Sequence, residues 1–90
     1  MGVTVTLSDL LKSATGQREP IDVPSGTPVD CLREVVNRVP ALGKWIYNDE
    51  DELKPHVWLV VNDERIYEEE YDEHLKAGDR LHIIIAVLGG

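Results

Sequence analysis

Apolar and polar residues alternate near the start of the chain, in the segment VTVTL at residues 3–7. A period of two built from β-branched residues predicts a half-buried strand. The same alternation returns in IDV at residues 21–23, after the polar segment SATGQREP at 13–20. Because that segment contains Gly16 and other turn-forming residues, we predict that the two strands form an opening hairpin.

A helix is predicted to begin after Thr27, in the segment TPVDCLREVVNRV. Thr27 can cap the first turn, Pro28 suits the first helical position, and Asp30 lies near the positive end of the helix dipole. Pro40 ends the helix, because the residue before a proline avoids helical dihedral angles. Apolar residues at helical spacing form one stripe along this segment: Val29, Leu32, Val35, Val36 and Val39.

The second half of the chain has longer apolar runs. ALGKWIY at 41–47 predicts a short helical turn, and HVWLVVN at 56–62 is a continuous run typical of a strand covered on both faces. ERIY at 64–67 predicts a short returning strand, and Gly78 is the expected left-handed turn residue before the last strand. That strand, RLHIIIAV at 80–87, should lie centrally in a sheet, since a long apolar edge would invite aggregation.

This order of elements predicts an α+β roll with a mixed sheet and one main helix packed across it. Its 90 residues suit a single domain over 1–90, with a flexible diglycine tail at about 87–90. Seventeen acidic against nine basic residues give a net charge of −8, which excludes nucleic acid as the expected partner and favours a basic protein surface.

One cysteine, Cys31, permits no disulfide within the chain, so we expect a reducing, cytoplasmic environment. The chain lacks both a secretory leader pattern and an apolar run long enough to span a bilayer, so no membrane association is expected.

Enzymatic motifs are missing from the sequence, which has no Gly-rich phosphate loop, no paired-histidine zinc spacing and no Cys-x-x-Cys. His56, His74 and His82 are scattered, and Cys31 borders the apolar stripe of the helix, so structural roles are expected for all four. We therefore expect no catalytic residue, no metal site and no bound cofactor.

Two acidic runs, NDEDE at 48–52 and EEEYDE at 68–73, lack the ligand spacing of a calcium loop. They are interpreted as solvated loops or as a docking face for basic residues of a partner.

The chain ends in two glycines, Gly89 and Gly90, directly after the last predicted strand. A tail that leaves a rigid strand holds its terminal carboxylate at a defined place above the domain. Residues without Cβ atoms can also enter a slot too narrow for any side chain. These are the physical requirements of a carrier whose reactive group is its own C-terminus.

Together these segments resemble the small ubiquitin-like sulfur-carrier proteins of the ThiS/MoaD family, over nearly all 90 residues. The segments that carry the resemblance are VTVTL with the following TG, TPVDCLREVV with Pro40, VWLVVNDE at 57–64, LKAGD at 75–79, and AVLGG at 86–90. The tail departs from the family pattern, because many relatives place a proline before the tail and a small residue where this chain has Leu88.

The resemblance implies a β-grasp (ubiquitin-like) fold and a chemical cycle at Gly90. An adenylyltransferase related to the ubiquitin-activating enzymes would consume ATP to adenylate the Gly90 carboxylate. A persulfide donor would then supply sulfur, leaving a thiocarboxylate. Val87, Leu88 and Gly89 would be the tail residues inserted into the partner. The first acceptor implied is an enzyme such as the molybdopterin synthase large subunit.

Other functions remain open at this point. The acceptor could belong to cysteine or thiamine synthesis, or Gly90 could form an isopeptide bond to lysines, as in a ubiquitin-like modifier. A β-grasp interaction module with an idle tail is a further alternative. For every function in which Gly90 reacts, Ile84 and Ala86 are candidate docking residues for a partner. Alternation places them on the strand face opposite Leu81, Ile83 and Ile85.

Overall fold

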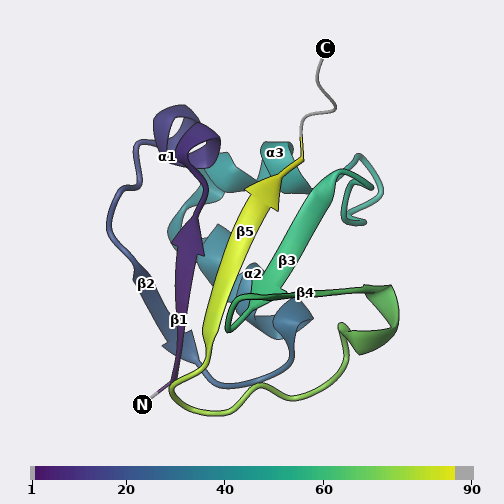
Figure 1. Cartoon of the computed structure of the whole chain (residues 1–90). Helices are drawn as coiled ribbons and strands as arrows, with labels where there is room; N and C mark the ends of the chain where they lie inside the picture. The colour runs from purple at the N-terminus through teal and green to yellow at the C-terminus, as the bar shows by residue number, and fades with distance from the viewer. Residues whose placement is uncertain (1, 87–90) are drawn as a thin grey trace.

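A mixed five-stranded sheet lies in front of the helices in Figure 1, and the computed structural model describes residues 2–86. The strands are β1 (Gly2–Leu7), β2 (Ile21–Pro24), β3 (Val57–Val61), β4 (Glu64–Ile66) and β5 (Arg80–Ile85). Their order is β2-β1-β5-β3-β4, with β5 parallel to β1 and antiparallel to β3. The last strand is therefore central, as the sequence predicted, and the mixed α+β fold is confirmed.

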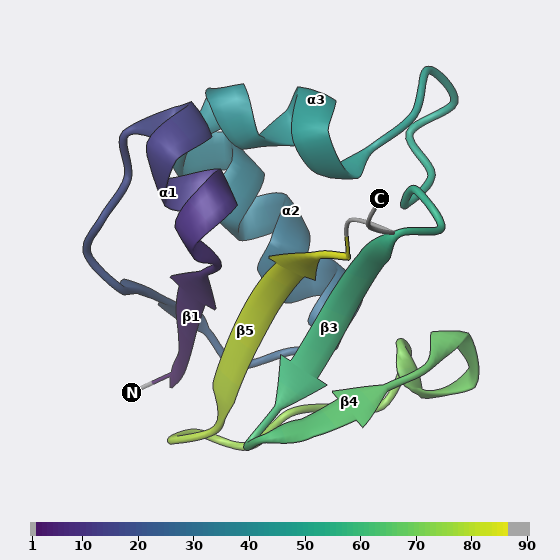
Figure 2. The same ribbon diagram turned by 45° about the horizontal axis from the view of Figure 1, so that its top comes forward.

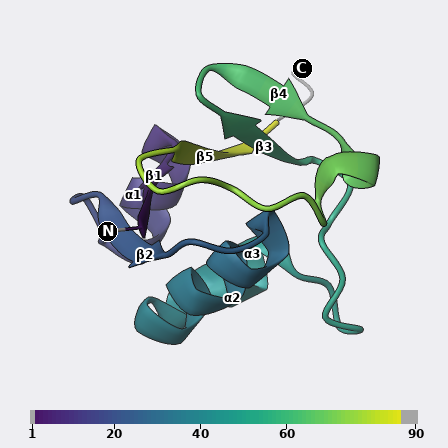
Figure 3. The same cartoon turned by 90° about the horizontal axis from the view of Figure 1, so that it is seen from below.

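The main helix, α2 (Pro28–Arg38), crosses one face of this sheet (Figure 3). Its predicted start is confirmed: the Thr27 hydroxyl accepts a hydrogen bond from the Asp30 amide at 3.1 Å, and the Asp30 carboxylate accepts one from the Thr27 amide at 3.4 Å. This reciprocal capping box satisfies two of the amides that a helix start leaves unpaired. The expected short helical turn follows as η1 (Pro40–Leu42) and α3 (Gly43–Ile46).

The predicted opening hairpin is wrong in its connection. β1 and β2 do pair in antiparallel fashion, with Val3 opposite Val23. The connection between them, however, contains a helix, α1 (Asp9–Thr15), which ends at Gly16 with a φ of 78°. Leu11 of this helix is fully buried in the core, so tertiary packing stabilises a helix too short to persist alone.

The prediction that β3 is covered on both faces is also wrong. Val57 and Leu59 are buried against the helices, at 4% and 0% exposed, whereas the alternating residues Trp58 and Val60 are only half-buried. The strand therefore has one core face and one open face.

The core lies between the sheet and the helices. Its buried members are Val3, Val5, Leu7, Leu11, Ile21, Val23, Cys31, Leu32, Val35, Val39, Leu42, Ile46, Val57, Leu59, Leu81 and Ile83. Figure 2 shows that the loop after α3 and the short helix η2 (Glu68–Glu70) both extend beyond the β3 side of the sheet. Gly78, with a φ of 94°, is the left-handed turn residue that the sequence predicted before β5.

Candidate functional site

The central strand β5 leads directly to the predicted reactive tail. The last described residue, Ala86, donates its amide hydrogen to the His56 carbonyl at 2.8 Å, so regular pairing with the β3 side continues to the end of the described chain. Val87, Leu88, Gly89 and Gly90 lie outside the described residues. Their proposed roles in carrying sulfur and entering a partner stay predictions.

The two predicted docking residues lie at this end of β5. Leu81 and Ile83 are fully buried on the core face, whereas Ile84 is half-buried and pairs with Trp58 across the strands. Ala86 follows the strand and is also half-buried. The predicted alternation is thus present at Ile83 and Ile84, while the docking role of Ile84 and Ala86 is not decided by their placement.

A cluster of aromatic and cationic side chains extends this open face toward β4. The guanidinium carbon of Arg65 lies 3.8 Å from the centre of the Trp58 ring and 4.6 Å from that of Tyr67. Stacking of this kind holds a cation over an aromatic face and fixes the orientation of all three side chains. We call the following residues the open-face patch: Trp58, Val60, Arg65, Tyr67, His82 and Ile84.

Sequence reasoning missed the Trp58, Arg65 and Tyr67 cluster. The signal that could have revealed it was the period of two in β3 and β4, which the continuous apolar run obscured. Pairing of Val60 with Arg65 brings the two strands into register, so that position 58 and position 67 come to the same face. Tyr67 is half-exposed, which leaves its ring available to a partner.

His82 and Cys31, two side chains that could carry chemistry, have structural roles in the fold. His82 shares a 2.6 Å hydrogen bond between its Nδ1 and the Thr6 hydroxyl, across β5 and β1. Cys31 is buried as expected, and this burial raises the pKa of its thiol. A thiol of this kind stays protonated and is a poor nucleophile.

Neither a metal-binding cluster nor a bilayer-spanning helix occurs among residues 2–86. No cluster of three or more His, Cys, Asp or Glu side chains in this part of the chain could hold a metal ion. Within the same residues, no helix has both the length and the apolar character needed to cross a bilayer.

A sheet with a central last strand, a capped helix across one face and an open second face defines the ubiquitin-like β-grasp class. No protein-family model and no curated protein sequence matches the chain. Solved structures do match. SAMP1 from Haloferax volcanii is 30% identical with a TM-score of 0.83, and the match covers 98% of both chains.

Small archaeal modifier protein 1 from Methanosarcina acetivorans is 26% identical with a TM-score of 0.83, over 98% of this chain and 95% of that one. A chain of the BexX/CysO complex from Amycolatopsis orientalis is 28% identical with a TM-score of 0.78, over 98% and 99%. The chain belongs to the ubiquitin-like sulfur-carrier proteins of the ThiS/MoaD family.

Proposed function

We propose that this protein is activated at Gly90 and carries sulfur there as a thiocarboxylate. The observation that supports this most is a structural match over 98% of the chain to ubiquitin-like proteins, combined with a diglycine that follows the central strand. The protein is a co-substrate in this scheme, which agrees with the lack of catalytic motifs in its sequence.

The chemistry requires two steps at one carbon. A carboxylate oxygen of Gly90 attacks the α-phosphorus of ATP on an adenylyltransferase, releasing pyrophosphate and forming an acyl adenylate. A persulfide on a donor protein then displaces AMP from the carbonyl carbon. A second thiol attacks the resulting S–S bond, leaving the sulfur on Gly90 as a thiocarboxylate and forming a new disulfide between the two thiols.

The domain would supply binding and orientation for both steps. The open-face patch offers apolar and aromatic area next to β5, whose last pairs with β3 are Trp58 with Ile84 and Val57 with Ile85. An exposed apolar and aromatic surface is a common protein docking site. A partner bound there would lie near Ala86, the last residue that the structure describes, and Gly89 and Gly90 have no side chain that would prevent entry into a narrow channel.

We also propose which kind of enzyme accepts the sulfur. A biosynthetic enzyme of the molybdopterin synthase large-subunit type is the first acceptor to test, followed by acceptors in cysteine and thiamine synthesis. The match to a chain from the BexX/CysO complex supports a function in which the protein binds a partner protein. We propose the cytoplasm as the compartment, because a single buried cysteine suits a reducing environment.

A second function is favoured by a specific observation. Two of the matched structures are of proteins described as small archaeal modifier proteins. This supports a role as a protein modifier, with the same Gly90 adenylate captured by a lysine amine of a target. Activation is shared by both functions, so they differ only in the nucleophile that accepts the acyl group.

Intact mass spectrometry separates these proposals. The full chain is incubated with ATP, its activating enzyme and a persulfide donor. Exchange of one oxygen for one sulfur at the C-terminus is expected. A chain lacking Gly90 should keep its thermal stability and acquire no sulfur. Recovery of unmodified protein from a reaction in which the activating enzyme is demonstrably active would refute the carrier function. Isopeptide-linked glycine remnants on target lysines would support the modifier function.

A further inference from the structure

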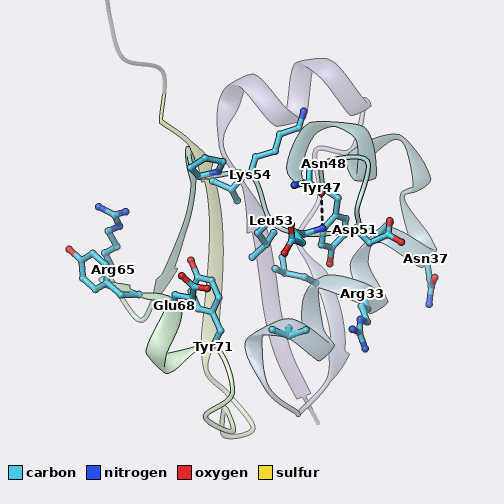
Figure 4. Close-up of a pocket in the computed structure, with 17 residues that line it drawn as sticks. Arg33, Asn37, Tyr47, Asn48, Asp51, Leu53, Lys54, Arg65, Glu68 and Tyr71 are labelled. Carbon is cyan, nitrogen blue, oxygen red and sulfur yellow. Dashed lines mark hydrogen bonds between the residues drawn. The ribbon is translucent and has the colours of Figure 1, made fainter.

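A groove of about 1050 Å³ lies between the helix layer and the β3–β4 edge of the sheet, and it shares Arg65 and Tyr67 with the open-face patch. One wall is α2, another is the loop that follows α3, and the third is formed by β3 and the segment around η2 (Figure 4). The groove is lined by apolar and aromatic side chains that include Val29, Val36, Leu53, Val57, Tyr47 and Tyr71.

Two half-buried tyrosines, Tyr47 and Tyr71, line the groove. Burial raises the pKa of Tyr47, although nearby Arg33 lowers it in part. Burial likewise raises the pKa of Tyr71, against the opposing effect of Arg65. Both hydroxyls therefore lie in surroundings that disfavour a charged group, even though the groove is open to solvent.

Both acidic runs of the sequence border this groove. Asp51 and Glu52 line it from the loop side and Glu68 lines it from the η2 side, and Figure 4 shows Asp51 and Glu68 on opposite walls. The two segments, 48–54 and 67–73, hold nine of the 17 acidic residues of the chain. These residues are Asp49, Glu50, Asp51, Glu52, Glu68, Glu69, Glu70, Asp72 and Glu73.

Three cations, Arg33, Lys54 and Arg65, also line the groove. The Lys54 ammonium group donates a hydrogen bond to the Lys44 carbonyl at 2.9 Å, so this lysine is directed toward α3. Arg33 lies on the α2 wall, across the groove from Glu68 (Figure 4). Against these three cations, the segments 48–54 and 67–73 carry nine acidic residues, so the rims are net acidic around an apolar floor.

We propose that this groove binds a segment of a partner protein in which an apolar side chain is flanked by lysines or arginines. The apolar side chain would contact Val36, Leu53 and Tyr71, and the flanking cations would lie against the two acidic rims. A second copy of this chain is a poor occupant, because each copy carries a net charge of −8.

The groove adjoins the end of the central strand. Val57, in its lining, pairs with Ile85, the last residue of β5. A partner that docks on the open-face patch and acts on the C-terminus could thus extend a basic segment around the β3 edge into the groove. Binding of a segment in the groove does not depend on the proposed adenylation of Gly90, because it can be measured with no activating enzyme present.

The proposal can be tested with a ten-residue peptide that has two central leucines, each flanked by lysines. A matched peptide with glutamates in place of the lysines is the control. Titration into the ¹⁵N-labelled full chain should shift amide signals of Val36, Leu53 and Tyr71 with the lysine peptide only. Raising the salt from about 0.05 M to about 0.5 M should weaken binding, because exposed charges are screened.

Charge-reversal variants distinguish an effect of the acidic rims from an effect of the net negative charge of the whole protein. Glu52→Lys with Glu68→Lys should weaken binding by about tenfold, since each reversal replaces an attraction with a repulsion. The control Glu19→Lys with Glu64→Lys makes the same change of net charge at exposed positions outside the groove lining. Val36→Gln tests the apolar floor without changing charge and should also weaken binding.

Three results would overturn the proposal. They are equal binding of the acidic peptide, equal weakening by the groove variant and its control, and amide shifts that fall on Trp58 and Ile84 in place of the groove. No shift at millimolar lysine peptide would overturn it as well. None of these results bears on sulfur transfer at Gly90, so the two proposals fail independently.

Discussion

Arg65 stacks over Trp58 on the open face of the sheet, with its guanidinium carbon 3.8 Å from the ring centre. The two residues belong to neighbouring strands, β4 and β3, and Trp58 pairs in turn with Ile84 of β5. A tryptophan, an arginine and an isoleucine are thus connected across three strands. The tryptophan and the isoleucine are half-buried and the arginine is exposed. Tryptophan and arginine are the residue types most often found to dominate binding energy in protein interfaces.

Trp58→Ala is expected to weaken binding to the activating enzyme by about 2 kcal/mol or more, the usual loss at an interface hot spot. Isothermal titration calorimetry with the unmodified full chain measures this directly. Leu10→Ala is the matched control, because Leu10 is an exposed apolar residue on α1, at 44% exposed, outside the open-face patch. If both variants bind as the wild type does, the open-face patch is not the docking surface.

Ile83 and Ile84 are adjacent residues that should have separable effects. Ile83 is fully buried, so Ile83→Ala should lower the free energy of unfolding by about 2–5 kcal/mol, measured by urea denaturation. Ile84 is half-buried on the open face, so Ile84→Ala should cost only about 1 kcal/mol of stability.

The same pair separates binding from folding. Ile84→Asp should abolish partner binding while the protein remains folded, because a carboxylate would be desolvated in the interface. Ile83→Val keeps the core nearly filled and should bind normally. An Ile84→Asp variant that folds and binds with wild-type affinity would exclude Ile84 from the interface.

The main elements of this fold could be predicted because their signals are local. The capping residues Thr27 and Asp30 mark the start of α2, and the apolar content of residues 80–85 required a central strand. The helix α1 could not be read in this way. It has only seven residues, and its stability comes from Leu11 entering the core, a contact made at long range.

The candidate sites were predictable to different degrees for the same reason. Alternation along one strand placed Ile84 opposite the core set. The stacking of Arg65 on Trp58 depends on the register between β3 and β4, which a single sequence does not specify. The facing of the two acidic runs likewise depends on how the loop after α3 and the segment around η2 pack, although each run was visible in the sequence.

Asp79 should make stability depend on pH in the acidic range. Hydrogen bonds from the Asn62 side chain and the Lys76 amide, at 2.9 Å and 2.7 Å, hold the pKa of Asp79 below its ordinary value of 3.8. A carboxylate with a lowered folded-state pKa stabilises the fold at pH values above its unfolded-state pKa. This contribution is lost as the pH falls through the lower, folded-state value.

Asp79→Asn should therefore be less stable than the wild type at pH 7, with the difference shrinking below about pH 4. Urea denaturation between pH 2 and pH 7 (roughly the range over which carboxylates titrate) measures this convergence. Asp72→Asn, at an exposed position after η2, controls for the loss of one negative charge. A constant difference between Asp79→Asn and the wild type across the whole range would contradict the prediction.

Leu88 should affect transfer to the acceptor more than activation. It stands where many family relatives have a small residue, directly before the diglycine that we propose enters the partner's channel. Adenylation requires the Gly90 carboxylate to reach ATP, and the activating enzyme of this protein must already accommodate a leucine.

Leu88→Ala should thus leave ATP–pyrophosphate exchange within about twofold of wild type, a difference of under 0.5 kcal/mol. It should change the rate of sulfur transfer to a cognate acceptor by tenfold or more, about 1.4 kcal/mol, because an acceptor channel shaped for leucine would lose that contact. Single-turnover transfer from the preformed thiocarboxylate isolates the second step, with Leu10→Ala, at an exposed position on α1, as the control. Equal effects of Leu88→Ala on exchange and on transfer would show that Leu88 does not select the acceptor.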